Sequence, residues 1–309
     1  MTTDIHSLGG QPVKLSLRSP RPTRTAVAIA SVATGMALTV PSLALAAHSG
    51  QSVPAPPANP TSASQIQNID QVKTAIKGYY GDTVSSTVIA PGTDPQAANP
   101  TYIHTFDPDG AYAHEVEAIA AKAGKTLATH HKRTADKAIL FDVDDTTLNT
   151  YSYEIFSNFV YNPATNANFV MAADPQVFPA VPGMVGLEKK AEAHGYDVYF
   201  LTGRPLAQAG ATVANLRAAG YDVNPEHLFT KDATAKSEPW LASCIVPDPA
   251  NPGQTKFGCS TIQYKSMTRE HIESLGVDIV ANFGDQFSDL KGGFADSTYK
   301  IPNPMYYLP

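Results

Sequence analysis

Several residues with chemically active side chains, and one glycine among them, follow short apolar runs in this sequence. In chain order they are Asp142, Asp144, Thr202, Gly203, Arg204, Asp285 and Asp289, and Lys265 joins the set as the residue that opens a predicted helix before the last run. A single aspartate in such a place is most often a turn residue, because its side chain hydrogen-bonds the local backbone. The ordered set is a stronger signal, since four separate stretches contribute Asp, Thr, Lys and Asp in that order.

The carboxylates of this set need positive charge among them. If Asp142, Asp144 and Asp285 gather at one edge of a sheet, they repel one another unless a cation lies between them. Mg²⁺ prefers oxygen ligands and retains several waters, so two carboxylates and a carbonyl are enough to hold it. Lys265 adds a fixed positive charge that suits a tetrahedral anion. The residues therefore predict Mg²⁺ beside a small anionic substrate.

Short apolar runs that alternate with amphipathic stretches would bring these residues together. The predicted strands are 138–141, 197–201, 227–230 and 277–281. The predicted helices are 68–80, 112–127, 183–194, 206–219 and 266–275. This alternation predicts an α/β fold, a Rossmann-like parallel sheet with helices on both faces. Ligands of such sheets bind outside the carboxyl ends of the strands, which is where the set lies.

The candidate residues fall into four motifs, and a fifth short sequence follows them. The stretches are 141–146 (FDVDDT), 200–204 (FLTGR), 264–266 (YKS), 284–290 (GDQFSDL) and 301–304 (IPNP). In this order they resemble the haloacid dehalogenase (HAD) superfamily of aspartate-nucleophile phosphohydrolases. Within it, the chain resembles the acid phosphatase branch that includes plant vegetative-storage-type phosphatases and bacterial surface acid phosphatases. The resemblance covers about residues 138–308.

The resemblance implies a role for each residue of the set. Asp142 would attack phosphorus and form an aspartyl-phosphate, while Asp144 would donate and then accept a proton. The implied substrate-binding residues are Thr202, Gly203, Arg204 and Lys265. The implied ligands of Mg²⁺ are Asp142, Asp144 through its backbone carbonyl, Asp285 and Asp289. A supporting role is the alternative for Asp289, and a structural ion pair is the alternative for Arg204.

A cap insertion is expected at about 148–182, after the first motif, because this superfamily inserts its cap there. Of its aromatic residues, Tyr151 and Tyr153 lie nearest the nucleophile in sequence. They are candidates for stacking on an aromatic leaving group such as a nucleoside or a phenol. A small local core beneath the cap is the other interpretation.

The implied function is a Mg²⁺-dependent acid phosphatase that hydrolyses small phosphomonoesters, such as nucleotides or aromatic phosphates. We expect its optimum at roughly pH 5–6, because a general acid works best near its own pKa. A storage or binding protein of the same fold would have lost catalysis, usually at the nucleophile, whereas Asp142 is intact. A dehalogenase uses no metal and does not need Asp144.

The N-terminal residues 1–46 have the pattern of a signal peptide. A basic leader precedes the apolar run 26–40, and Ala44-Leu45-Ala46 offers a cleavage site. The small residues at the end and Pro41 argue against the alternative, a membrane anchor. The chain is therefore expected to be secreted, with a flexible leader at 47–64, a helical region at 65–137 and the HAD-like core at 138–309. Within the helical region, the face formed by Ile69, Val72, Ile76 and Tyr79 is expected to be buried.

Charge and cysteine content add two expectations. The net charge is −6 and no Lys/Arg-rich run occurs beyond the first 25 residues, which argues against a nucleic acid polymer as partner. In a secreted chain, the two cysteines Cys244 and Cys259 predict a disulfide. Two free buried thiols are the alternative.

Overall fold

The computed structural model describes residues 59–66, 68–88, 102–129, 136–172 and 177–308 of the chain. The predicted signal peptide and residues 47–58 of the predicted leader lie outside these ranges. Within them, no helix combines the length and the apolar composition that a membrane span requires.

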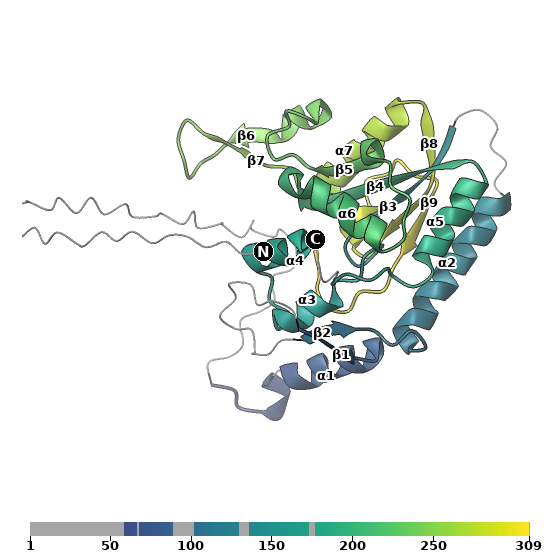
Figure 1. Ribbon diagram of the computed structural model, residues 1–309. Helices are drawn as coiled ribbons and strands as arrows, with labels where there is room; N and C mark the ends of the chain where they lie inside the picture. Colours follow the sequence, from purple (N-terminus) through teal and green to yellow (C-terminus); the bar gives the residue numbers. More distant parts are fainter. Residues whose placement is uncertain (1–58, 67, 89–101, 130–135, 173–176, 309) are drawn as a thin grey trace, which may run out of the picture. The chain divides into compact units, whose positions relative to one another are not determined.

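A five-stranded parallel sheet forms the centre of the described structure (Figure 1). In spatial order its strands are β5 (Leu228–Lys231), β4 (Tyr196–Pro205), β3 (Asp136–Phe141), β8 (Val277–Gly284) and β9 (Ser297–Lys300). All neighbouring strands pair in parallel. The four predicted strands are confirmed, with small differences at their ends. The fifth, β9, was not predicted, because Ser-Thr-Tyr-Lys contains no apolar run.

Helices cover both faces of the sheet (Figure 1). The α-helices are α1 (Ile69–Tyr80), α2 (Ala111–Thr129), α3 (Tyr151–Phe156), α4 (Pro163–Met171), α5 (Met184–Ala193), α6 (Ala209–Ala218), α7 (Thr261–Ser274) and α8 (Phe287–Leu290). Short 3₁₀ turns are η1 (Ala63–Gln65), η2 (Leu206–Gln208), η3 (Pro225–His227) and η4 (Pro239–Cys244). The five predicted helices are present. However, α7 begins earlier than predicted, because Ser260 and Gln263 form a capping box at its start. Lys265 therefore lies in the second turn of α7 and does not open the helix.

The central strand β3 is apolar on both sides, and this explains the layers. Ile139 and Phe141 join the hydrophobic cluster that contains the buried side chains of α2 and α5. Ala138 and Leu140 point the other way and join the cluster that contains the buried side chains of α7. Because successive side chains of a strand alternate between faces, a strand that is buried on both faces reads as one continuous apolar run.

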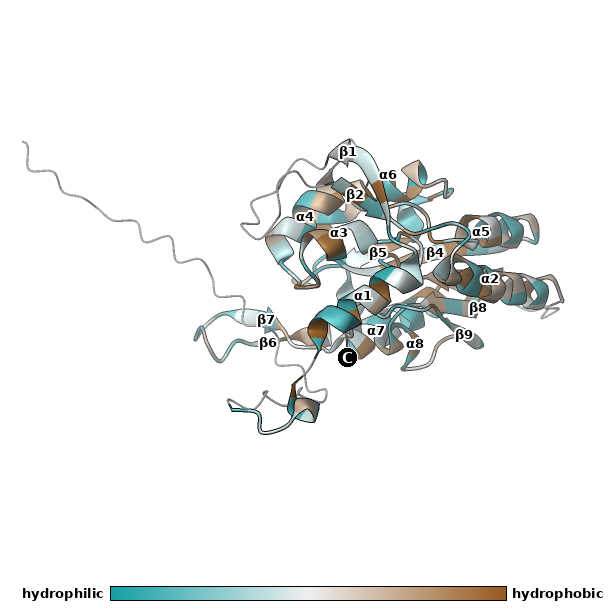
Figure 2. Cartoon of the chain, turned by 90° about the horizontal axis from the view of Figure 1, so that it is seen from below, coloured by the Kyte–Doolittle hydropathy of each residue, from teal (hydrophilic) through white to brown (hydrophobic). Residues whose placement is uncertain are grey.

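The N-terminal region 65–137 was predicted to be helical, but it also contains two β-strands. Between α1 and α2, β1 (Thr83–Val88) pairs with β2 (Tyr102–Thr105) in an antiparallel sheet. The predicted apolar face of α1 is also only partly right. Ile76 is buried, whereas Ile69 and Val72 are 58% and 59% exposed. Figure 2 shows both hydrophobic and hydrophilic segments along α1. Tyr80, at the end of α1, is fully buried.

The cap is fixed at its base and supported from the N-terminal region. Its two ends are joined by hydrogen bonds from Asn149 N to Pro179 O (2.8 Å) and from Val181 N to Thr147 O (2.9 Å). The ring of Tyr151 in α3 stacks on that of Tyr80, with centroids 4.5 Å apart. The N-terminal region thus supplies part of the core beneath α3.

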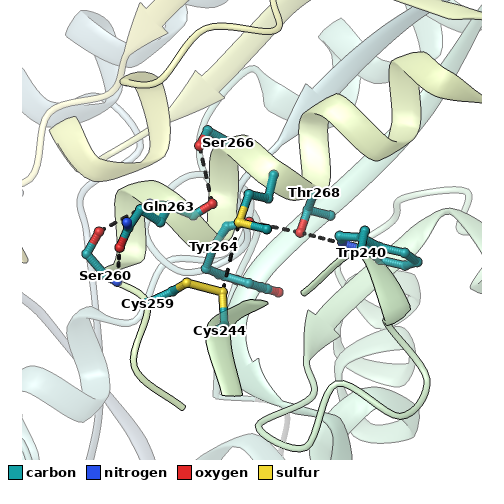
Figure 3. The surroundings of a disulfide bond; sticks show 9 residues. Trp240, Cys244, Cys259, Ser260, Gln263, Tyr264, Ser266 and Thr268 are labelled. Carbon is teal, nitrogen blue, oxygen red and sulfur yellow. Dashed lines mark hydrogen bonds between the residues drawn. A yellow bond between two sulfur atoms is a disulfide. The ribbon is translucent and has the colours of Figure 1, made fainter. Parts of the chain in front are cut away.

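A further insertion lies between β5 and α7. It contains the antiparallel strands β6 (Ile245–Pro247) and β7 (Thr255–Phe257). The predicted disulfide between Cys244 and Cys259 is present in the structure. Cys259 directly precedes Ser260, the N-cap residue of α7, so the disulfide lies beside the start of that helix (Figure 3).

Candidate active site

The turn after β3 presents two of the predicted catalytic carboxylates, those of Asp142 and Asp144. Asp145 follows them in the left-handed region, with φ 57°, which aspartate tolerates better than most residues. Its buried carboxylate accepts hydrogen bonds from Thr150 N (2.9 Å), Thr150 Oγ1 (2.5 Å) and the Tyr306 hydroxyl (2.8 Å). These bonds hold the turn in one conformation.

Lys265 reaches from α7 to the end of β3. Its Nζ donates to Asp142 Oδ1 at 2.5 Å and to the Leu201 carbonyl at 2.7 Å, and it lies 3.1 Å from Asp289 Oδ1. An ammonium group has three donors, and these contacts employ all of them. Burial lowers the pKa of Lys265, but the Asp142 and Asp289 carboxylates raise it by more, so the group stays charged. Lys265 is thus a fixed, buried positive charge.

Three buried carboxylates form a cluster that suits a divalent cation. Asp142, Asp285 and Asp289 each offer one oxygen, and these oxygens lie within 4.8 Å of one another. Burial raises the pKa of Asp142 to about 7, although Lys265 acts in the opposite direction. Burial and the neighbouring carboxylates also raise the pKa of Asp285 well above its ordinary value. A hard cation with oxygen ligands would relieve this repulsion and favour the ionised forms.

The side chain of Asp144 lies apart from this cluster and is held by Arg204. Arg204 Nε donates to both carboxylate oxygens, at 3.2 and 3.0 Å, and Nη2 donates to Oδ1 at 2.6 Å. Its Nη1 donates to Thr212 Oγ1 at 3.2 Å. The Arg204 side chain is 3% exposed and that of Asp144 is 30% exposed. The structure therefore contains the ion pair that was the alternative for Arg204, and a substrate contact by Arg204 stays a prediction.

Thr202 and Gly203 lie beside these groups in the C-terminal part of β4, which ends at Pro205. The Thr202 hydroxyl accepts from the Arg204 backbone N–H at 3.1 Å, and the Thr202 carbonyl accepts from the Tyr264 hydroxyl at 2.9 Å. The hydroxyl keeps its own proton as a donor. Gly203 is exposed, and a Cβ at this position would meet no atom within 4 Å.

A family model described as HAD superfamily, subfamily IIIB (acid phosphatase), matches residues 86–240 and 253–309. The chain belongs to this family. The match spans every residue of the site described above. It omits 241–252, the part of the insertion that contains Cys244, so this half of the disulfide lies outside the family pattern.

Curated relatives of this chain include plant proteins of different kinds. The stem 28 kDa glycoprotein of Glycine max is 30% identical over 194 residues, which are 60% of this chain and 63% of the relative. Acid phosphatase 1 of Solanum lycopersicum is 25% identical over 209 residues, covering 67% and 73%. Vegetative storage protein 1 of Arabidopsis thaliana is 27% identical over 173 residues, covering 55% of each. The chain thus spans less than two thirds of the length of several of these relatives.

Among solved structures, the class C acid phosphatase of Bacillus anthracis with tungstate bound is similar to this chain. The two chains are 22% identical, with a TM-score of 0.44. The similarity covers 63% of this chain and 81% of the other.

The prediction that Tyr151 and Tyr153 stack on a leaving group is wrong. Both side chains are buried, at 0% and 1% exposure. Tyr151 stacks on Tyr80, and Tyr153 packs edge-on against Phe169 with ring centroids 5.4 Å apart. The local core is the correct interpretation. Nearness to Asp142 in sequence was misleading, because α3 directs these rings inward.

Asn303 and Tyr306 also reach the site, and no role was predicted for either. Asn303 Nδ2 donates to Asp285 Oδ2 at 2.7 Å, and the Tyr306 hydroxyl donates to Asp145. The only signal was the sequence 301–304, noted as similar to the family without an assigned role.

Proposed function

We propose that this chain is a secreted, Mg²⁺-dependent acid phosphatase that hydrolyses phosphomonoesters through an aspartyl-phosphate on Asp142. One observation carries the proposal. Lys265 Nζ lies 2.5 Å from Asp142 Oδ1, beside the buried carboxylates of Asp285 and Asp289. A carboxylate nucleophile with a fixed cation and a cluster of oxygen ligands is suited to attack on a phosphate dianion.

In the first step, a carboxylate oxygen of Asp142 forms a bond to phosphorus and the bond to the leaving oxygen breaks. Asp144, which is protonated before this step and is positioned by Arg204, gives its proton to that oxygen, so the alcohol leaves neutral. The Thr202 hydroxyl donates to a phosphoryl oxygen. Lys265 offsets the negative charge that Asp142 and the phosphoryl group bring together.

In the second step, water attacks phosphorus and gives its proton to the Asp144 carboxylate. The bond between phosphorus and Asp142 breaks, inorganic phosphate leaves, and both carboxyl groups return to their starting forms. Asp142, the Asp144 carbonyl, Asp285 and Asp289 would hold Mg²⁺. When bound, the ion supplies positive charge for the phosphoryl oxygens.

Secretion follows from the signal-peptide pattern of residues 1–46. The disulfide between Cys244 and Cys259 supports an oxidising compartment, because such bonds persist mainly outside the cytosol. The substrates proposed are small phosphomonoesters, such as aromatic phosphates or nucleotides.

A storage protein with the phosphatase fold is the second candidate, because storage proteins are among the relatives. The intact arrangement of Asp142, Lys265 and the carboxylate cluster argues for catalysis. The cluster of buried carboxylates argues against dehalogenation, because that reaction uses no metal and so does not need a set of metal ligands.

Hydrolysis of para-nitrophenyl phosphate with Mg²⁺ and with a chelator separates these functions. We expect turnover with Mg²⁺, loss of turnover with chelator, and a loss of more than about 10³-fold for Asp142→Asn. Asp136→Asn, at the exposed opposite end of β3, is the matched control and should keep full activity. Residual activity of Asp142→Asn within tenfold of the wild type would contradict the nucleophile assignment. An inactive wild type would favour the storage function.

A further inference from the structure

The segment 301–308, named here the C-terminal strap, runs from the end of β9 back over the loop that carries Asp285. Ile301 N donates to the Gly284 carbonyl at 2.9 Å. At its other end, Leu308 N donates to Gln286 Oε1 at 2.9 Å, and Ser288 Oγ donates to the Leu308 carbonyl at 3.1 Å. The strap is therefore fixed at one end to the last residue of β8 and at the other end to the following loop and the start of α8. The catalytic steps above use none of its residues.

Asn303, in the strap, controls one oxygen of the Asp285 carboxylate. Its Nδ2 donates to Asp285 Oδ2 at 2.7 Å, and Gln286 Nε2 donates to the same oxygen at 2.6 Å. The Asn303 amide is itself oriented, because its Oδ1 accepts from Met305 N at 2.9 Å. A carboxylate oxygen has two lone-pair directions, so these two donors occupy Oδ2 fully. Oδ1 accepts one longer hydrogen bond, from Thr146 Oγ1 at 3.4 Å, and so keeps a second lone-pair direction that can bind a cation.

Tyr306, also in the strap, acts on the turn after β3. Its hydroxyl donates to Asp145 Oδ2 at 2.8 Å. Asp145 has a left-handed backbone and is flanked by Asp144 and Thr146, so its side-chain bonds determine how the turn is held. One short segment thus touches both halves of the candidate site, the Asp285 loop and the turn that carries Asp142.

We propose that the C-terminal strap is a positioning element of the active site. Asn303 restricts Asp285 to metal binding through one oxygen, and Tyr306 fixes the turn that presents Asp142 and Asp144. The inference rests on the proposed Mg²⁺ dependence. Groups that hydrogen-bond metal ligands typically change metal affinity or activity by 10–100-fold when removed.

The two positions should fail in different ways. Asn303→Leu removes the donor while keeping the shape, so the apparent Kd for Mg²⁺ should rise by about 10–100-fold. Saturating Mg²⁺ should recover most of its kcat. Tyr306→Phe removes one hydroxyl, so its Mg²⁺ affinity should stay within about threefold while kcat falls about tenfold at saturating Mg²⁺.

The chain offers a matched control for each variant. Asn251 Nδ2 donates to Asp248 Oδ2 at 2.7 Å in the insertion, the same contact as that of Asn303 but away from the site. Tyr307 is adjacent to Tyr306 and 63% exposed. Asn251→Leu and Tyr307→Phe should match the wild type in both Mg²⁺ affinity and kcat.

Mg²⁺ affinity is measured without substrate, by calorimetric titration and by the rise in Tm as MgCl₂ is added to chelator-treated protein. If Asn303→Leu binds Mg²⁺ with the same affinity as the wild type, the role of Asn303 is overturned. A kcat for Tyr306→Phe equal to that of Tyr307→Phe would overturn the role of Tyr306. No Mg²⁺ response in the wild type would overturn the metal part of the proposed function and the role of Asn303 with it. Tyr306→Phe preserves the ring, so the strap remains testable if Asn303→Leu does not fold.

Discussion

Replacing Lys265 by methionine tests whether a fixed charge holds the carboxylates at the end of β3. The substitution keeps an unbranched side chain of similar length and removes the ammonium. In the structure this group is 2% exposed and contacts Asp142, Asp289 and the Leu201 carbonyl. Methionine replaces none of these interactions, so two buried carboxylates lose their counter-charge.

The expected loss of stability follows from these contacts. Removing one partner of a buried ion pair costs about 3–5 kcal/mol, because the remaining charge is left uncompensated. For a domain of this size, about 1 kcal/mol shifts Tm by roughly 2–4 °C, so Tm should fall by roughly 6–20 °C.

The loss should also depend on pH. Burial already raises the pKa of Asp142 to about 7, with Lys265 opposing the rise, so the pKa goes higher without Lys265. When folding raises the pKa of a carboxyl group, the free energy of unfolding of the protein falls as pH rises through that raised pKa. The deficit should therefore be smaller at pH 5 than at pH 8.

The measurement is thermal and guanidinium denaturation of chelator-treated protein at pH 5 and pH 8. Lys125→Met is the control, because Lys125 is an exposed lysine in α2. Added Mg²⁺ should restore part of the stability of Lys265→Met, since a cation among the carboxylates substitutes for the lost charge. A loss below about 1 kcal/mol at pH 8 would refute the reasoning, given that a broken buried pair costs several times that amount.

Three further variants test other parts of the structure. Arg204→Met should lower kcat more for an alkyl phosphate than for para-nitrophenyl phosphate, because the poorer leaving group depends more on a well-placed Asp144; equal losses for both substrates would contradict this. Glu188 in α5 is buried, and its Oε2 has no hydrogen-bond partner among the residues that the structure describes; burial raises the pKa of Glu188 to about 7 from 4.5. Glu188 should thus contribute a fall of up to about 3 kcal/mol in wild-type stability as pH rises from 4.5 through 7, and Glu188→Gln should make the fall smaller by that amount in urea denaturation. Replacing Cys244 and Cys259 together by serine should lower the free energy of unfolding by about 3 kcal/mol, since the disulfide closes a loop of 15 residues; a change below about 1 kcal/mol in the same denaturation assay would argue against that model.

The parallel sheet could be predicted because its central strands are buried on both faces. Ile139 and Leu140 lie in opposite hydrophobic clusters, so β3 appears as a continuous apolar run. The strands β9 and β1 could not be found in this way, because Ser297–Lys300 and Thr83–Val88 are mainly polar. These segments form strands through backbone hydrogen bonds to neighbouring strands, and such bonds do not require an apolar pattern of side chains.

The candidate site could be predicted in its ordered motifs but not in its supporting contacts. Strand ends of a parallel sheet meet at one edge, so Asp142, Thr202 and Asp285 were expected to come together. The link between Arg204 and Asp144 depends on side-chain direction, which strand position does not determine. The contacts of Asn303 arise from a segment without secondary structure, where no periodicity guides the assignment.

The contact between Tyr306 and Asp145 has a consequence for the order in which the protein is made. The two residues are 161 positions apart, and Lys265 lies 123 positions after Asp142. At synthesis rates of about 5–20 residues per second, Asp142 and Asp145 emerge roughly 10–30 s before Tyr306. Such distant contacts also close slowly during folding. Nascent and prematurely terminated chains should therefore carry Asp142 without hydrolysing phosphate esters, and activity should begin only once the last strand and the segment after it have been synthesised.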